Sequence, residues 1–497
     1  MSPGMPERQR LLIIWSALLA LFLGALDALV MTAAMPTIVA ELGGMSLYAW
    51  VYSAYFLFRA VSLPVFGKLS DVYPARNLML VSISLFALAS AAAGASPTMG
   101  VLVGARVFQG IGAGGIFALV YVVLSDVSLP AQRGRTLSFA SAVWGLSSVI
   151  GPTLGGVIVT YLSWPWIFYM NLPLGALCFA GIALFFREFR KKPGQARLDI
   201  PGITCFTTTV LAGLTLIMTG GREIPWLSGP GLALAGLTLA AGAGFVLSER
   251  RSSAPFMDFA FFQNRGFAVG TAMTFASSFT MFSLFAYAPL FLQGALGEPP
   301  MTVGYAMLFL SLGWSVGSLA MGRTLNRVGQ KPAAAGGALL MTLGALCCTG
   351  FSQDSSLAWC FAVFLFIGLG MGGVTLSTLI IVQNSLGDEH LGAATSFHQF
   401  ARTLGGTVGV GICGSLVFAR LTRAGGIALP QGLSEGLHGS LAQIFQPTFQ
   451  AAMPQDALMV LHRAVLDGVG LAFVAASATA FLCLVLSIFL PANEKSD

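Results

Sequence analysis

The sequence has little charge, little histidine and no cysteine arrangement that suggests a site. Only 9% of its 497 residues are charged, whereas soluble proteins carry about 25%. Its seven cysteines are an odd number without metal-ligand spacing, and it has four histidines, so we expect neither a disulfide framework nor a Cys/His metal centre. These shortages argue against a soluble domain, and we expect no metal and no other cofactor.

Long apolar runs and glycine are what the sequence has in abundance. Hydrophobic residues make up 56% of the chain and 60 residues are glycine, which suits helices that pack backbone to backbone in lipid. About fourteen runs reach the ~20 residues that cross a bilayer as a helix. The first, from Leu11 to about Ala34, is longer than the ~7 to 15 residues of a signal-peptide core and contains Asp27. We therefore predict an all-α integral membrane protein whose first run is a membrane helix.

The loop charges predict the orientation in the membrane. Basic residues concentrate in one set of alternate loops and ends, from Arg8 and Arg10 to Lys495, and the positive-inside rule makes this set cytoplasmic. Both termini are then cytoplasmic, which requires an even number of helices. The net charge of +6 thus reflects orientation in a membrane, and we expect no nucleic-acid partner.

One apolar run carries an arginine. Arg106 lies in LVGARVFQGIGAG, residues 102–114, about nine residues after the run begins and therefore roughly 13 Å deep. A charge at that depth costs at least ~2.5 to 3.5 kcal/mol on insertion scales, so it normally faces a partner or a watery cavity. The glycines of this stretch imitate a nucleotide-binding loop, but they lie inside a membrane helix with no preceding strand.

The next apolar run carries a ladder of small residues. Ser147, Gly151 and Gly155 repeat every four residues and form a stripe where another helix can approach closely. Pro152 lies inside the stripe and removes a backbone donor, so we expect the helix to bend there.

These two patterns resemble the second and third signature motifs of the major facilitator superfamily, in its proton-coupled drug antiporter branch. The arginine motif of that family is matched by Leu102, Arg106, Gln109, Gly110 and Gly112. The antiporter motif is matched by Gly151, Pro152, Gly155 and Gly156, with Ser147 where a further glycine is usual. Residues 26–38, 164–173, 287–297 and 402–410 resemble further motifs of its fourteen-helix branch.

The resemblance implies a fold and a domain organisation. Members of the superfamily have two six-helix halves, and the fourteen-helix branch has two more helices inserted between them. We expect an N-terminal half at residues 1–190, two inserted transmembrane helices with basic connectors at 191–265, and a C-terminal half at 266–497. The last part includes a long external loop at 419–467.

A third stretch resembles the first superfamily motif. Gly67, Leu69, Asp71 and Arg76 match it, while Val72, Pro74 and Ala75 depart from it. In the family this turn is a cytoplasmic latch between conformations, and its aspartate is the key group. The resemblance implies a latch at Asp71, which we expect to pair with Arg76 or Arg133.

Three ionisable residues, Asp27, Arg59 and Arg106, fall at similar depth, roughly 12 to 15 Å from the outer face. Burial favours a protonated carboxyl, whereas a nearby arginine favours the carboxylate. The resemblance implies that Asp27 carries the proton and that Arg106 couples its charge to the cavity; a static ion pair is the alternative. We expect Arg59 either to contact substrate or to balance the charge of Asp27. His398 relays protons or is a plain hydrogen-bonded histidine.

The expected substrate cavity combines aromatic and polar side chains. Tyr52 and Tyr55 share a helical face with Arg59, and Arg402 shares one with His398. A phenylalanine stripe lies on the first helix of the second half, which lines the cavity in the superfamily; a lipid-facing stripe is the alternative. The cavity set is Tyr52, Tyr55, Gln109, Phe275, Phe279, Phe282 and Arg402.

The resemblance implies a transporter and not an enzyme. We expect a proton-coupled antiporter of the bacterial inner membrane that exports amphipathic or hydrophobic compounds by alternating access, and thereby gives multidrug efflux and antibiotic resistance. Because the apolar stretches of the later helices hold no acid, we expect neutral, zwitterionic or anionic substrates. A lipid or secreted-metabolite transporter of the same fold is the alternative. We expect a monomer whose partners are substrate, protons and the lipid bilayer.

Overall fold

The computed structural model describes residues 6–42, 47–129, 132–187, 199–220, 224–252, 257–298, 300–387, 390–428 and 455–491. Over these ranges the chain is helical apart from short turns and one isolated bridge between Gly220 and Ile224. The predicted all-α class is confirmed.

The helices follow one another with short connections. The first seven are α1 (Glu7–Leu42), α2 (Tyr48–Val72), α3 (Ala75–Gly94), α4 (Met99–Val127), α5 (Arg133–Tyr161), α6 (Trp166–Tyr169) and α7 (Asn171–Phe185). Next come α8 (Ile200–Thr219), α9 (Gly229–Arg251) and the 3-10 helix η3 (Phe259–Gln263). The last are α10 (Arg265–Gly294), α11 (Pro300–Val328), α12 (Gln330–Thr349), α13 (Leu357–Leu386), α14 (Leu391–Ala428) and α18 (Gln455–Ile488).

Within the described residues, 12 helical segments are long and apolar enough to cross a membrane, with α6 and α7 forming one of them. Helices α2 and α5 are similarly long, at 25 and 29 residues, but are not among these segments. Arg59, Lys68 and Asp71 lie within α2. The fold is therefore all-helical with about twelve candidate spans, and the count of fourteen stays a prediction that requires α2 and α5 to cross as well.

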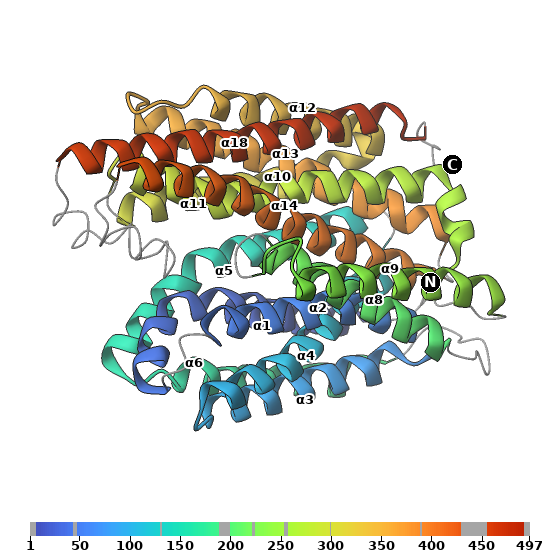
Figure 1. Ribbon diagram of the computed structural model, residues 1–497. Helices are drawn as coiled ribbons and strands as arrows, with labels where there is room; N and C mark the ends of the chain where they lie inside the picture. The colour runs from blue at the N-terminus through green and yellow to red at the C-terminus, as the bar shows by residue number, and fades with distance from the viewer. Residues whose placement is uncertain are drawn as a thin grey trace.

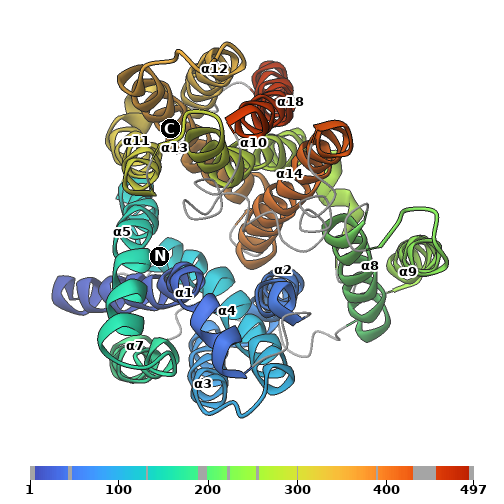
Figure 2. The ribbon, with the colours of Figure 1, turned by 60° about the vertical axis from the view of Figure 1, so that its left-hand side comes forward.

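The helices form two bodies that lie side by side. Figure 1 shows α1 to α7 in one body and α10 to α14 with α18 in the other, and Figure 2 shows α8 next to α2 and α14 with α9 outside it. The apolar window of α9 is 11% buried, against 83% for that of α4. Helix α9 thus faces the surroundings, while α4 lies deep within its body.

Glycines allow α4 to approach both of its neighbours. A Cβ added at Gly110 would lie 2.5 Å from the carbonyl oxygen of Tyr55 in α2, and one at Gly112 would lie 2.6 Å from the backbone nitrogen of Phe86 in α3. No larger residue fits at these crossings. The apparent nucleotide loop is therefore a packing motif.

The second body repeats this arrangement in α13. Residues 110–115 read GIGAGG, and residues 368–373 read GLGMGG. Gly368 and Gly372 lie against α11, and a Cβ at Gly370 would lie 2.5 Å from the carbonyl oxygen of Gly337 in α12. Helix α13 thus packs between α11 and α12 as α4 packs between α2 and α3. The shared glycine spacing is an internal repeat of the two bodies.

Helical structure extends into both ends of the predicted external loop 419–467, but the candidate membrane spans on either side of it end at Val417 and begin at His462, so the loop stays a prediction. Helix α14 continues to Ala428 and α18 begins at Gln455, while residues 429–454 lie outside the described residues. These helical extensions carry Arg420, Arg423 and Arg463. Helix ends that are read from the length of an apolar run fall at the first such charges. A helix can nevertheless continue through charged residues once it leaves the bilayer.

Candidate functional site

The centre of the first body is a buried ion pair between α1 and α4. The Arg106 Nη1 donates to Asp27 Oδ2 at 2.7 Å, and both side chains are fully buried. The same Nη1 donates to Gln109 Oε1 at 2.8 Å, and Arg106 Nε donates to the Val51 carbonyl at 3.3 Å. The structure thus brings together the acid and the arginine that sequence depth placed at one level.

Two amides complete the coordination of Asp27. Gln109 Nε2 and Asn171 Nδ2 donate to Asp27 Oδ1 at 2.8 and 2.9 Å. Both amides also donate to the Ser90 hydroxyl, which in turn donates to the Phe168 carbonyl at 2.9 Å. The carboxylate therefore receives three donors from α4 and α7, and a hydroxyl of α3 fixes two of them. We call Asp27, Ser90, Arg106, Gln109 and Asn171 the Asp27 network.

Arg59 lies next to this network, and its guanidinium group packs against aromatic rings. Its guanidinium carbon is 4.8 Å from the Phe56 ring centre and 5.0 Å from that of Phe117. The Tyr55 ring lies between the two arginines, 4.1 Å from Arg106 and 5.7 Å from Arg59. Among the described residues, Arg59 Nη1 is buried without a hydrogen-bond partner. Arg59 therefore does not satisfy Asp27 directly.

Arg402 brings a second buried cation from the other body. Its side chain is 5% exposed and its guanidinium lies 5.3 Å from the Trp144 ring in α5 and 5.6 Å from the Trp314 ring in α11. Trp144 packs on Phe117 at 5.4 Å, so aromatic rings connect Arg402 to Arg59. The two charges lie within electrostatic range of each other, and neither has a salt bridge within the described chain.

His398 belongs to a separate polar cluster in the second body. Its Nε2 lies 3.0 Å from the Thr378 hydroxyl, and Thr274 of α10 donates to that hydroxyl at 3.1 Å. His398 Nδ1 has no partner among the described residues. Within the described residues no hydrogen bond joins His398 to the Asp27 network, so its role as a proton relay stays a prediction.

The predicted latch residue Asp71 connects the two bodies. Its Oδ1 and Oδ2 accept hydrogen bonds from the backbone N–H groups of Gly392 and Ala393, each at 3.0 Å, in the first turn of α14. This is where a helix best stabilises a negative charge. A Cβ added at Gly392 would meet Asp71 and lie 2.7 Å from the Gly67 carbonyl. A Cβ added at Gly67, the glycine of the motif, would lie 2.9 Å from the Gly392 carbonyl oxygen, so the close crossing of α2 and α14 requires glycine there as well.

The two basic residues expected to pair with Asp71 have different surroundings. Arg76 donates from Nη2 to the Ala183 carbonyl of α7 at 2.6 Å. Arg133 is half-buried at the start of α5. Pairing of either with Asp71 stays a prediction.

The small-residue ladder of α5 packs on α1 close to the Asp27 network. A Cβ added at Gly151 would lie 2.7 Å from the Leu29 Cβ, two residues after Asp27. Ser147 and Gly155 are also buried. The helix runs unbroken past Pro152 and Gly156, whose surroundings lie outside what the structure describes.

The remaining cavity residues mostly contact neighbouring helices. The Tyr52 and Tyr55 hydroxyls donate to the Met31 and Gly24 carbonyls of α1, each at 3.2 Å. The phenylalanine stripe of α10 faces the glycines of α14: Phe275 lies against Gly405, Phe279 against Gly409 and Phe282 against Gly406. This contact explains the glycines of residues 402–410, and a cavity role for the stripe stays a prediction.

A metal site is not apparent in the described part of the chain, where no group of three or more His, Cys, Asp or Glu side chains could hold an ion. The site is instead a buried ion-pair network beside a set of aromatic rings and two arginines, Arg59 and Arg402, that have no acidic partner among the described residues. Such an arrangement can exchange a proton at one acid and attract an anionic or neutral aromatic group next to it.

The sequence resembles membrane transporters over most of its length. It is 33% identical to the multidrug transporter protein MdtP of Bacillus subtilis over 84% of this chain and 77% of that protein. It is 26% identical to multidrug resistance protein 3 of the same organism over 96% of this chain and 94% of that protein. The MFS-type transporter gkaD of Penicillium citrinum is 32% identical over 79% of this chain and 69% of that protein.

Solved structures share the fold at low sequence identity. The human organic anion transporter MFSD10 superposes with a TM-score of 0.64 at 16% identity, over 97% of this chain and all of that one. The proton:xylose symporter XylE gives 0.63 at 13% identity, over 98% and 97% of the two chains. The family model of the Major Facilitator Superfamily matches residues 17–410. The chain therefore belongs to the Major Facilitator Superfamily.

Proposed function

We propose that this chain is a fourteen-helix drug:proton antiporter of the bacterial inner membrane, with both termini cytoplasmic, that exports amphipathic compounds. Efflux transport is supported by the family and by relatives named as multidrug transporters. The observation that carries proton coupling is the fully buried Asp27 carboxylate with three donors directed at it. An ionisable group inside a membrane bundle is expensive and is typical of a functional site.

Protonation of Asp27 changes what its network can bind. As a carboxylate it only accepts hydrogen bonds, whereas as a carboxylic acid it must also donate one. A proton therefore removes the charge that offsets Arg106 and turns one acceptor position into a donor. The bonds from Arg106, Gln109 and Asn171 are then weakened, because they no longer go to a charged acceptor. Helices α1, α4 and α7 hold one arrangement with Asp27 ionised and another with Asp27 neutral.

Helix α5 is suited to transmit this change to the other body. It contacts α1 at Gly151 and Leu29, next to Asp27. It contacts the second body through Gly145, against which Ser315 of α11 packs, and through Trp144, on which Arg402 lies. A shift of α1 therefore moves the helix that borders both the proton site and the second body.

The substrate site we propose lies between Arg59 and Arg402. Two buried cations without acidic partners in the described chain favour a neutral, zwitterionic or anionic compound over a dication. The rings of Phe56, Phe117 and Trp144 around them favour an aromatic or otherwise apolar body. Both bodies contribute to this site, as alternating access requires.

One end of the bundle is closed in this arrangement. Asp71 bonds the start of α14, and Gln383 Nε2 of α13 donates to Ser125 Oγ of α4 at 3.1 Å. Both contacts connect the two bodies at the same end, the one we propose to be cytoplasmic. We propose that release of these bonds opens the path on that side.

Transport into inside-out vesicles tests the proposal. A panel of lipophilic fluorescent compounds of different charge is offered under an imposed proton gradient, with the vesicle interior acidic. Wild type accumulates a neutral or anionic member only while the gradient lasts, Asp27→Asn does not, and the exposed Asp354→Asn behaves as wild type. Gradient-driven accumulation by Asp27→Asn would contradict the role of Asp27, and movement of dications alone would contradict the substrate class.

The alternative is a transporter of lipids or of a secreted metabolite with the same fold. An ordered external segment between Ala419 and Asp467 would favour it. Residues 429–454 of that segment lie outside the described residues. The efflux of amphipathic compounds remains the function we propose because relatives named as multidrug transporters match most of the chain.

A further inference from the structure

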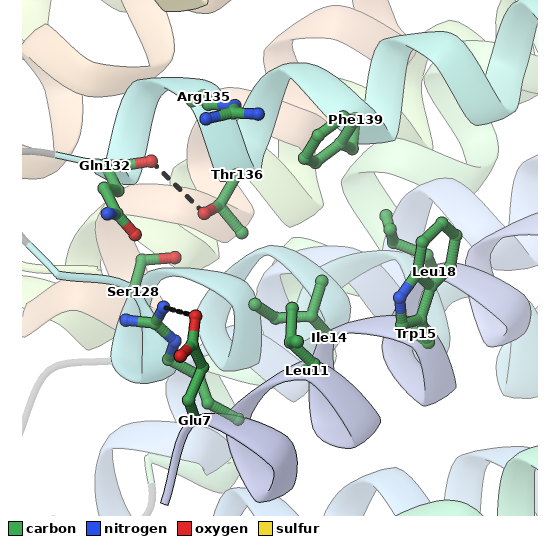
Figure 3. A pocket seen from close by; sticks show the side chains of 11 residues that line it. Glu7, Leu11, Ile14, Trp15, Leu18, Ser128, Gln132, Arg135, Thr136 and Phe139 are labelled. Atoms are coloured by element: carbon green, nitrogen blue, oxygen red, sulfur yellow. Dashed lines mark hydrogen bonds and ion pairs between the residues drawn. The ribbon is translucent and has the colours of Figure 1, made fainter. Parts of the chain in front are cut away.

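A pocket outside the proposed transport path lies where α1 begins and α4 passes to α5. It has a volume of about 310 Å³ and is lined from these three helices (Figure 3). That volume equals about ten waters, enough for a phosphate with its glycerol. None of its lining residues belongs to the Asp27 network or to the substrate site, so the inference does not rest on the proposed function.

Polar and apolar side chains of the pocket are separated along the helix axis. Arg10, Gln132 and Arg135 lie near the first turns of α1 and α5. Trp15 and Leu18 follow on α1, roughly 8 to 12 Å beyond Arg10 at ~1.5 Å per residue. The pocket therefore has a charged mouth and an apolar continuation into the membrane.

The charged mouth keeps unsatisfied positive charge. Arg10 Nη2 is 4.0 Å from Glu7, whose side chain is 80% exposed, so this pair is weak. Arg10 Nε is buried without a partner among the described residues. Arg135 is exposed and forms no salt bridge within the described chain. The pocket lining thus carries two guanidinium groups, those of Arg10 and Arg135, and one carboxylate, that of Glu7.

The apolar continuation is open to the surrounding lipid. Trp15 is 65% exposed, Leu11 45% and Phe139 37%, and Figure 3 shows Leu11 and Trp15 on α1 with Phe139 opposite them on α5. Tryptophan near a helix end is typical of the membrane interface. A soluble anion would cover only the mouth, whereas a phospholipid covers both parts.

We propose that this pocket binds an anionic phospholipid of the adjacent leaflet. Its phosphate lies between Arg10 and Arg135, and one acyl chain follows Leu11, Trp15 and Phe139. Basic pockets between transmembrane helices bind anionic headgroups in this way.

Native mass spectrometry of the purified chain tests the site. The protein in detergent is titrated with phosphatidylglycerol, and with phosphatidylcholine as the zwitterionic control. Phosphatidylglycerol binds more tightly, and Arg10→Gln and Arg135→Gln each weaken it about fivefold and together about 25-fold, from the usual contribution of one basic residue near a membrane surface. Arg323→Gln, exposed on α11, leaves the affinity unchanged.

Quenching of the Trp15 fluorescence by brominated lipids tests the site independently in a bilayer. A small fraction of brominated phosphatidylglycerol quenches the protein more than the same fraction of brominated phosphatidylcholine. This difference disappears in Trp15→Phe and in the double arginine variant. Equal quenching by both lipids, or unchanged phosphatidylglycerol binding in the double variant, overturns the proposal. Competition by inorganic phosphate or glycerol phosphate at the same concentration as the lipid assigns the pocket to a soluble anion and also overturns it.

Discussion

Asp27 and Arg106 are both fully buried, and each is costly without the other. Their attraction is strong in a low dielectric, but it mainly offsets the desolvation of two charges. The network of Gln109, Asn171 and Ser90 supplies the further donors that such a pair needs. Gain or loss of one proton by Asp27 therefore strongly changes the interactions within this network.

Removing Arg106 alone is expected to destabilise the fold more than removing the whole pair. Arg106→Met leaves the Asp27 carboxylate uncompensated, which costs about 3 to 5 kcal/mol in buried pairs. The double variant Asp27→Asn/Arg106→Met carries no buried charge and recovers most of this loss. Thermal unfolding in detergent measures both, and equal loss in the single and double variants would contradict the ion-pair account. Neither variant is expected to transport.

The two unpaired arginines are expected to select substrate charge. Arg59→Gln or Arg402→Gln raises the KM for an anionic substrate about tenfold, since a hydrogen bond to a charged group contributes about 1.5 to 3 kcal/mol. The KM for a neutral substrate of similar shape changes little. Vesicle uptake with the two compounds side by side measures the ratio, and an equal rise for both would show a structural role. The exposed Arg323→Gln is the matched control.

Sequence reasoning finds charged residues in membranes better than neutral polar ones. The depth of Asp27 and Arg106 was enough to predict their meeting. Asn171 and Ser90 were missed because a single amide or hydroxyl in an apolar run costs little and signals little. Gln109, predicted to line the substrate cavity, binds Asp27 and Ser90, and its contact with substrate stays a prediction. The asparagine of residues 164–173, which resemble a family motif, was the available signal.

At the scale of helices, the repeated glycines of α4 and α13 explain the close packing of each body. The same spacing recurs, but the charged residues do not: the residue four positions before Gly110 is Arg106, whereas the one before Gly368 is Phe364. The packing is therefore duplicated, whereas within the described residues the buried ion pair occurs in the first body and has no counterpart in the second.

Valine at either member of the repeat is expected to destabilise its body. Gly112→Val and Gly370→Val place side chains where a Cβ alone would lie 2.6 Å and 2.5 Å from neighbouring backbone, and overpacking costs about 1 to 3 kcal/mol or more. Gly104→Ala, on the same helix as Gly112 with nothing within 4 Å, is neutral or stabilising by up to about 1 kcal/mol. Thermal unfolding compares the three, and a tolerated Gly112→Val would contradict the packing account.

Helix positions were largely predictable, because an apolar run of spanning length has few alternatives to a membrane helix. The ends were less predictable. Helix α14 continues through Arg420 and Arg423, where hydropathy falls but helix formation does not. The hydrogen bonds that Asp71 accepts at the start of α14 could not be predicted from the sequence, since backbone N–H groups leave no signal in it.

At the scale of the whole molecule, α8 and α9 lie beside the boundary of the two bodies. Leu57 and Val61 of α2, Phe206 and Leu214 of α8, and Phe400 of α14 belong to one hydrophobic cluster. Phe206 packs on Phe400 at 5.3 Å. Helix α8 thus covers one side of the boundary between α2 and α14, across which the bodies would move.

Loss of the Asp71 contact is expected to open the closed end. Asp71→Ala removes the acceptor of the Gly392 and Ala393 N–H groups and exposes the crossing of α5 and α11 at the same end. A cysteine introduced at the buried Ser138, against which Gly322 packs, should then react several-fold faster with a membrane-impermeant maleimide. An unchanged rate would show that Asp71 does not hold this end closed.

Substrate-induced proton release tests proton exchange at Asp27 most directly. The purified protein in weakly buffered detergent is mixed with a compound that the vesicle assay has shown to be transported, and the pH is followed. The account predicts release from wild type and none from Asp27→Asn, with the same compound still binding to the variant. Equal release from both proteins would contradict it and would place the exchanged proton elsewhere.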